Sequence, residues 1–163
     1  MGKTTFIKNL LEGSRHLHPV GFYTAEIREE GMRKGFELVN LKGERGVFSH
    51  VDIKSPHRVG RYKVDVRGFE DFLDGISFLD PSSNLIIMDE IGKMECLSTQ
   101  FDRSMKEVLD SEKWVIATIA LKGSGMIAEV KQRRDVKLFE ITQSNRDVLF
   151  SEILKNIFRF KNN

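Results

Sequence analysis

The sequence predicts an α/β fold in which a mostly parallel β-sheet is flanked by helices and carries an antiparallel β-hairpin region. From Val66 onward, strand-like and helix-like stretches alternate, which is the order of elements in parallel sheets. The run Asn84–Met88, "NLIIM", is apolar without interruption, as in a strand buried on both faces. Residues 20–53 instead alternate apolar and polar side chains around glycine turns, which is typical of antiparallel strands.

Two helices are predicted before the apolar strand, one on each side of the antiparallel region. The first occupies residues 4–13 and ends at Gly13, which we expect to cap it. Four apolar residues at helical spacing form its buried face: Phe6, Ile7, Leu10 and Leu11. The antiparallel turns fall at Glu30-Gly31 and Lys42-Gly43. The second helix lies within residues 64–79, and one of its faces is apolar, with Phe69, Phe72 and Leu73.

Further helices and strands alternate after the apolar strand. We expect helices over residues 101–109, 126–133 and 146–158. We expect strands over residues 114–121, "WVIATIAL", and 136–142, "VKLFEIT". No linker or repeat interrupts the chain, so residues 1–163 are interpreted as a single domain.

Composition excludes several classes of protein. Lys and Arg total 26 against 24 acids, and this net charge of +2 gives no reason to expect nucleic acid or an anionic membrane as a partner. Cys96 is the only cysteine, so no intramolecular disulfide is possible, and no CxxC motif or Cys/His cluster suggests zinc. No apolar run approaches the ~20 residues that span a bilayer. We expect a cytoplasmic protein and a monomer.

The first chemical signal is Gly2-Lys3-Thr4-Thr5, followed at once by the first helix. These residues match the end of the phosphate-binding loop G-x-x-x-x-G-K-[ST], in which backbone N–H groups and the lysine hold phosphates and the hydroxyl binds magnesium. The first glycine of that loop is absent. Gly-Lys-Thr also occurs by chance at the start of ordinary helices, so this signal alone leaves both interpretations open.

The second signal is "LIIMDEIGKME", residues 85–95. A buried parallel strand that ends in Asp89 places this carboxylate at the sheet edge where α/β proteins bind ligands. Asp89 could hold Mg²⁺ there, and Glu90 could orient or deprotonate an attacking water. The alternative interpretation is that the strand ends in charged residues simply because the chain leaves the core there. The two signals together make nucleotide phosphate chemistry the leading hypothesis.

The string "DEIGKME", residues 89–95, resembles the signature of the THEP1-type nucleoside triphosphatases, relatives of the human cancer-related nucleoside triphosphatase. Other blocks that resemble this family occur in order along nearly the whole chain: "GKTT" at 2–5, "GFYTAEIRE" at 21–29, "GF" at 35–36, "VGRYKVDV" at 59–66 and "TQSNRD" at 142–147. The resemblance implies a P-loop NTPase fold with Walker A and Walker B motifs. It also implies slow Mg²⁺-dependent hydrolysis of ATP, GTP and other nucleoside triphosphates.

The resemblance assigns roles to individual residues. Lys3 would contact the β- and γ-phosphates, while Thr4 and Asp89 would bind Mg²⁺. Gly2 and Thr5 would donate to phosphate, and Glu90 would act on the water. Lys93 would be a second cation near the γ-phosphate, although its spacing fits a solvated loop lysine equally well. Asn145 and Arg146 lie between the last strand and the last helix and could flank the base. Phe22 and Tyr23 could form a wall of the nucleotide cleft or pack in the core.

This chain departs from the family pattern at two places, which limits how far the family's residue roles apply to it. The family reads Thr-Glu-Glu after Gly-Phe, whereas this chain has Thr24-Ala25-Glu26, so any role of the first acid is lost. Family members also begin with an apolar strand and a complete glycine-rich loop. We therefore expect the natural protein to start about a dozen residues upstream of Met1. If it starts at Met1, we expect weak nucleotide binding, because most backbone donors of the loop are missing.

Two other function classes use the same phosphate-binding residues. A nucleotide or nucleoside kinase would pass the γ-phosphate to an acceptor other than water, although the sequence shows no arginine-rich lid. A non-catalytic nucleotide-binding protein would be favoured if the short N-terminus is genuine. The leading hypothesis remains a nucleoside-triphosphate phosphohydrolase.

Overall fold

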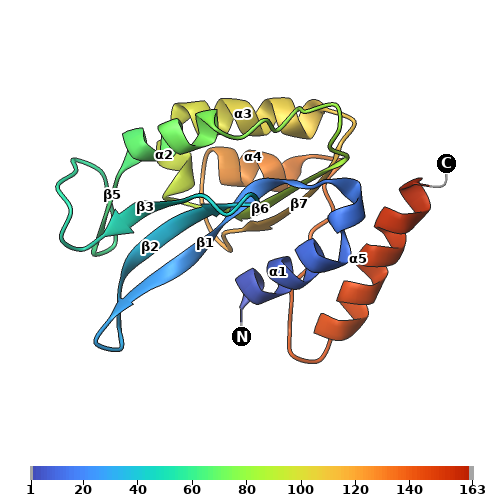
Figure 1. The fold of residues 1–163 in the computed structure, drawn as a ribbon, viewed down its shortest axis with the longest axis horizontal. Coiled ribbons are helices and arrows are strands. Elements are labelled where there is room, and N and C mark those ends of the chain that lie inside the picture. Colours follow the sequence, from blue (N-terminus) through green and yellow to red (C-terminus); the bar gives the residue numbers. More distant parts are fainter. Residues whose placement is uncertain (1, 162–163) are drawn as a thin grey trace.

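The computed structural model describes residues 2–161 as one mixed β-sheet with helices on both faces (Figure 1). The strands are β1 (Val20–Glu29), β2 (Met32–Asn40), β3 (Arg45–His50), β4 (Arg58–Val59), β5 (Tyr62–Val64), β6 (Leu85–Ile91) and β7 (Trp114–Ile119). The helices are α1 (Lys3–Gly13), α2 (Val66–Asp74), α3 (Thr99–Asp110), α4 (Met126–Gln132) and α5 (Arg146–Lys161). Two 3₁₀ turns, Arg15–Leu17 and Glu95–Leu97, complete the described elements. None of the described helices is long and apolar enough to cross a membrane.

The seven strands follow the order β4-β5-β3-β2-β1-β6-β7. Pairing is parallel between β1 and β6 and between β6 and β7. The pairs β1–β2, β2–β3, β3–β5 and β4–β5 are antiparallel. The predicted α/β class and the parallel core are therefore confirmed, and the predicted antiparallel region is continuous with that core in a single sheet.

The turn between β1 and β2 confirms the predicted position of the first hairpin. Glu30 and Gly31 both have positive φ angles, 50° and 76°, as in the two-residue turns that match the twist of paired strands. The tip of the β1–β2 hairpin points away from the end of the molecule where α5 lies (Figure 1).

The buried side chains of β6 alternate between two hydrophobic clusters, one on each face of the sheet. Ile86 and Met88 belong to a cluster with α2, α3 and α4, while Leu85 and Ile87 belong to a cluster with α1 and α5. Successive side chains of a strand point to opposite faces, so β6 supplies both clusters. This explains the uninterrupted apolar run that predicted the strand, because both of its faces are covered.

Aromatic rings form the centre of the cluster under α2 and α3. Phe22 has no exposed surface, and its ring centroid lies 5.9 Å from that of Phe69 and 6.4 Å from that of Phe101. Phe22 is therefore a core residue of β1. Tyr23, the next residue, is half-buried, and the Nζ atom of Lys8 in α1 lies 4.9 Å from its ring centroid.

Two sequence expectations about secondary structure need correction, and one short element was not predicted. The predicted strand over residues 136–142 is wrong, because that segment is irregular and pairs with no strand among residues 2–161. An apolar β-prone stretch becomes a strand only where a neighbour supplies a hydrogen-bonding edge. Gly13 is the last residue of α1 rather than its cap, which is Ser14. The short hairpin β4–β5 was not predicted, because its strands have only two and three residues.

Candidate active site

The N-terminus of α1 is fixed by apolar residues one turn further along. Gly2 precedes the helix with extended backbone angles, and no side chain caps the first turn. The first turn also contains no acidic residue, which leaves its N–H groups and positive dipole end available to an anion. Phe6, Ile7 and Leu10 are buried in the cluster with β6, so Lys3 and Thr4 are held beside the end of that strand.

Asp89, the residue after the apolar run of β6, lies between two threonine hydroxyls. The Thr4 hydroxyl donates to Asp89 Oδ2 over 2.6 Å, although the two residues are 85 positions apart. The Thr118 hydroxyl at the end of β7 donates to Asp89 Oδ1, also over 2.6 Å. Both carboxylate oxygens are therefore engaged, and the orientation of the carboxylate is fixed by two different elements.

Burial governs the electrostatics of this carboxylate. Asp89 is 3% exposed. Its burial raises the pKa above the usual aspartate value, while the hydrogen bonds from Thr118 and Thr4 act in the opposite direction. A cation bound beside Asp89 would offset the cost of burying its charge.

Glu90 and Lys3 form an ion pair at the same edge of the sheet. Lys3 Nζ lies 2.9 Å from Glu90 Oε2 and also donates to the backbone oxygen of Ile119 over 3.2 Å. The two side chains are 47% and 34% exposed, so the pair stabilises the fold by only about 0–1 kcal/mol. A phosphate group could therefore draw Lys3 away from Glu90 at small cost.

A second carboxyl group, Glu95, lies close to Glu90 across Gly92. A Cβ atom added at Gly92 would lie 2.7 Å from Glu90 Oε1 and 2.8 Å from Glu95 Oε2, so only glycine fits without moving one of the two. Glu95 is 4% exposed, and burial raises its pKa to about 8. Its carboxyl group is therefore mostly protonated at neutral pH and can donate a hydrogen bond.

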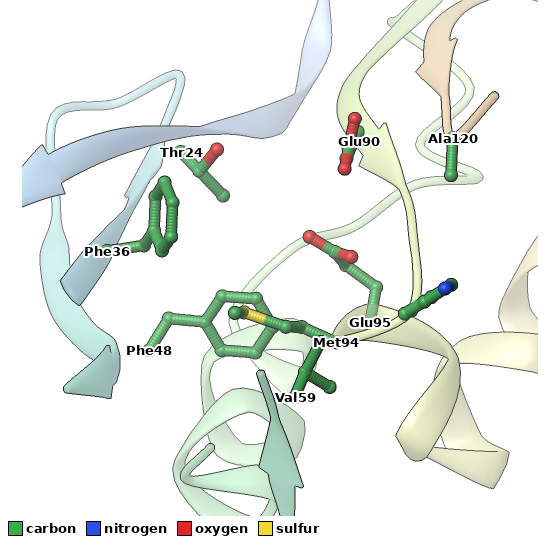
Figure 2. Close-up of a pocket in the computed structure, with 9 residues that line it drawn as sticks. Thr24, Phe36, Phe48, Val59, Glu90, Met94, Glu95 and Ala120 are labelled. Atoms are coloured by element: carbon green, nitrogen blue, oxygen red, sulfur yellow. The ribbon is translucent and has the colours of Figure 1, made fainter. Parts of the chain in front are cut away.

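Glu90 and Glu95 both line a cavity of about 240 Å³. Figure 2 shows these two carboxyl groups across the cavity from Thr24 and the Phe36 ring, with the Phe48 ring below. The remaining lining residues are Val59, Lys93, Met94 and Ala120. The cavity wall is mainly apolar apart from the two acids, Thr24 and Lys93.

The other predicted site residues have different environments. Gly2 and Thr5 are exposed at the start of α1, and Lys93 is exposed at the cavity. The Asn145 side chain organises the turn before α5, since its Oδ1 accepts from the Thr142 N–H and its Nδ2 donates to the Glu140 carbonyl, both over 2.8 Å. The half-buried Arg146 lies 3.4 Å from the Asp147 carboxylate. The roles of Asn145 and Arg146 at a nucleotide stay predictions.

Two residues of the site were not predicted from the sequence. Thr118 could have been found because a hydroxyl closes the apolar strand next to β6, where parallel strands end at the same edge. In the sequence, Glu95 is distinguished only as the last residue of the "DEIGKME" string. Its burial depends on the 3₁₀ turn over residues 95–97, which returns it toward Glu90 and which the sequence pattern does not indicate.

The oxygens of Thr4 and Asp89 fit a hard divalent cation. Hydroxyl and carboxylate oxygens are the ligands of Mg²⁺, which keeps several waters and shares its coordination with substrate phosphates. No group of three or more His, Cys, Asp or Glu residues within residues 2–161 could hold a metal ion by itself. Two side chains that offer oxygen atoms would suit a cation that brings phosphate oxygens as further ligands.

Comparison with protein families and curated proteins gives similarities over nearly the whole chain. Residues 1–154 match the family described as NTPase. The chain is 44% identical over 158 residues to nucleoside-triphosphatase THEP1 of Thermotoga sp. (strain RQ2), covering 94% of this chain and 88% of that protein. It is 36% identical over 170 residues to the cancer-related nucleoside-triphosphatase of Homo sapiens, covering 94% of this chain and 90% of that protein.

Two solved structures are similar to this one. The crystal structure of THEP1 from Aquifex aeolicus has a TM-score of 0.79 and 32% identity, covering 94% of this chain and 91% of the other. The solution structure of a human cancer-related nucleoside triphosphatase has a TM-score of 0.80 and 34% identity, covering 96% of this chain and 92% of the other. The likeness therefore extends over the sheet and the helices on both of its faces.

Proposed function

This chain belongs to the NTPase family, as the "DEIGKME" resemblance predicted, and we propose that it hydrolyses nucleoside triphosphates at the site formed by Lys3, Thr4, Asp89 and Glu90. The observation that carries this proposal is the 2.6 Å contact between Thr4 Oγ1 and Asp89 Oδ2. It joins the start of a helix to the end of a parallel strand, and phosphoryl transfer needs a lysine, a hydroxyl and a carboxylate at that junction.

The start of α1 would bind the terminal phosphates. Backbone N–H groups at Gly2 and Thr5 and the positive end of the helix dipole favour negative charge. Lys3 would leave Glu90 and pair with the β- and γ-phosphates, since its ion pair with Glu90 is exposed and weak. Lys93 would supply a second positive charge from the cavity side.

Thr4 and Asp89 would hold Mg²⁺. When bound, the ion neutralises charge on the β- and γ-phosphate oxygens. Thr118 keeps the Asp89 carboxylate in one orientation through its own hydrogen bond, so the carboxylate does not have to reorient when nucleotide arrives.

Glu90 would act on the attacking water. The water oxygen forms a bond to the γ-phosphorus, and the bond from that phosphorus to the β,γ-bridging oxygen breaks. The proton of the water passes to the Glu90 carboxylate, and the products are the nucleoside diphosphate and inorganic phosphate. Pairing of Lys3 with phosphate frees the Glu90 oxygen that it engages in the described structure.

We further propose the location, oligomeric state and substrates of the enzyme. The enzyme acts as a cytoplasmic monomer on ATP, GTP and other nucleoside triphosphates, with Asn145 and Arg146 beside the nucleotide base. The near-neutral charge balance supports small-molecule substrates over nucleic acid or membrane partners.

Phosphate release tests the proposal directly. We expect the protein to release phosphate from ATP and GTP only with Mg²⁺. Glu90→Gln, which keeps the shape of the side chain but removes its basicity, is expected to lower kcat by about 10²–10⁴-fold. The matched control is Glu107→Gln, on the exposed surface of α3, which should retain full activity. Equal phosphate release by the Glu90→Gln variant and the wild type would contradict the role of Glu90, and nucleotide binding without release would identify a non-catalytic binding protein.

A further inference from the structure

Glu90 takes part in two sites. It pairs with Lys3 on the phosphate side, and it lines the cavity of about 240 Å³ on the other side. A single water occupies a share of roughly 30 Å³ in the liquid, so hydrolysis alone does not require a cavity of this size. The space beside the proposed base is large enough for a molecule with one ring.

The walls of the cavity are preformed by packing outside it. The Phe36 ring stands edge-on to Tyr62, with centroids 5.4 Å apart. Phe48 is 1% exposed and lies 4.7 Å from Phe69 in the core. Rings held in this way offer flat apolar contact at low entropic cost, which suits an aromatic ligand.

The polar groups of the cavity disfavour an anionic ligand. Of the two acids in the lining, Glu90 is the anion, because the buried Glu95 carboxyl group is mostly protonated, and only the exposed Lys93 among the lining residues carries positive charge. Thr24 adds a hydroxyl, and the Glu95 carboxyl group adds a hydrogen-bonding group across the cavity from it (Figure 2). A neutral ring with a polar substituent matches this lining, whereas a phosphate or carboxylate would meet like charge at Glu90.

We propose that this cavity binds a neutral aromatic alcohol with a single ring and that the enzyme transfers the γ-phosphoryl group of a nucleoside triphosphate to its hydroxyl group. The alcohol oxygen forms a bond to the γ-phosphorus, and the bond to the β,γ-bridging oxygen breaks. The hydroxyl proton passes to Glu90, and the products are a phosphate monoester and the nucleoside diphosphate. This inference rests on the proposed function, because it uses the same phosphate site and the same base.

The test uses benzyl alcohol and 3-pyridinemethanol as probes, together with the protein, ATP and Mg²⁺. Phosphorus NMR separates inorganic phosphate from phosphate monoester in one reaction. We expect both products, and ligand-observed NMR without ATP should show saturable binding of both alcohols. The anionic analogue 3-carboxybenzyl alcohol should bind at least tenfold more weakly than benzyl alcohol.

Three variants connect the ester to the cavity. Thr24→Leu fills the space and Phe36→Ala removes one wall, so each should lower the ratio of ester to inorganic phosphate at least tenfold. The control is Phe139→Ala, which removes a ring that is 41% exposed and outside the cavity lining, and which should leave this ratio unchanged.

The outcomes separate the two proposals. Inorganic phosphate without ester from either alcohol would overturn the acceptor proposal and leave the hydrolase intact. Neither product would overturn both. Ester formation with an unchanged ratio in both Thr24→Leu and Phe36→Ala would overturn the assignment of the acceptor to this cavity.

Discussion

The two faces of the sheet differ in both composition and chemistry. The face under α2, α3 and α4 has a phenylalanine-rich core, whereas the face under α1 and α5 is packed mainly by leucine and isoleucine (Figure 1). The α1 face delivers Thr4 to Asp89, and the opposite face supplies Phe48 to the cavity beside Glu90. The site is thus built where the two cores meet at the end of β6, with phosphate-binding groups on one side and aromatic walls on the other.

The largest expected effect comes from shortening a buried leucine. On either face this should lower stability, but only on the α1 face should it also lower kcat. Leu10 is fully buried, and Leu10→Ala should lower the free energy of unfolding by about 4 kcal/mol because it leaves a cavity. It should also lower kcat in the fraction that stays folded, since α1 carries Lys3 and Thr4. Denaturant titration and phosphate release measure the two effects.

Leu73→Ala in α2 is the matched variant on the other face, where the leucine is 3% exposed. We expect a similar loss of stability but wild-type kcat in the folded fraction. Equal losses of kcat in the two variants would contradict the special role of the α1 face.

The next effect concerns the charge of Asp89. Asp89→Asn keeps the size of the side chain but removes the carboxylate that Thr4 and Thr118 orient, and we expect phosphate release to fall about 10²–10³-fold. Binding of benzyl alcohol without ATP should not change, because Asp89 does not line the cavity. Asp71→Asn, on the exposed surface of α2, serves as the control.

The pH dependence of stability should reveal the buried acid on the cavity side. The folded-state pKa of Glu95 is about 8, above its ordinary value of 4.5, so between these values the native state binds more protons than the unfolded state. The contribution of Glu95 is therefore fully present below pH 4.5 and is lost as the pH rises through about 8, by at most about 1.4 kcal/mol per pH unit.

Glu95→Gln mimics the neutral form at every pH. Wild type and variant should have similar free energies of unfolding at pH 5, and the wild type should become the less stable of the two by pH 9. Parallel stability profiles over this range would show that Glu95 stays ionised in the folded protein.

The smallest expected effect concerns Thr118, which orients Asp89 without a predicted contact to nucleotide. Thr118→Val keeps the shape but removes the donor to Asp89 Oδ1, and we expect kcat to fall about tenfold, or about 1.4 kcal/mol. KM for ATP should change little. A loss as large as that of Asp89→Asn would mean that Thr118 contacts the reacting groups itself.

The sequence predicted the parts of the site that depend on local patterns. Gly2 to Thr5 at the start of a helix and Asp89 directly after an apolar run indicate which residues meet, because parallel strands and the following helices converge at one edge. Thr118 and Glu95 were missed because their roles depend on contacts across elements. Thr118 needs the pairing of β7 with β6, and Glu95 needs a turn that returns it to Glu90.

The incorrect prediction of a strand also arose because contacts between elements cannot be read from a local pattern. Residues 136–142 have the composition of a strand, but a strand forms only where another strand offers its edge, and the sequence of the segment does not specify that edge. Phe22 and Tyr23 are adjacent in β1 and face opposite sides, so Phe22 joins the core whereas Tyr23 meets Lys8 of α1.

The alternation along β6 also determines where this chain tolerates changes in length. Residues 85–88 place Asp89 on the same side as Leu85 and Ile87, next to α1. Deleting one residue of this run would move the carboxylate to the opposite face of the sheet and exchange the two sets of buried side chains. The exposed segment at residues 121–125 can gain or lose a residue without such an exchange. We therefore expect active variants to keep the number of residues in β6. Exchanges among large apolar residues within β6 should be tolerated better than a deletion.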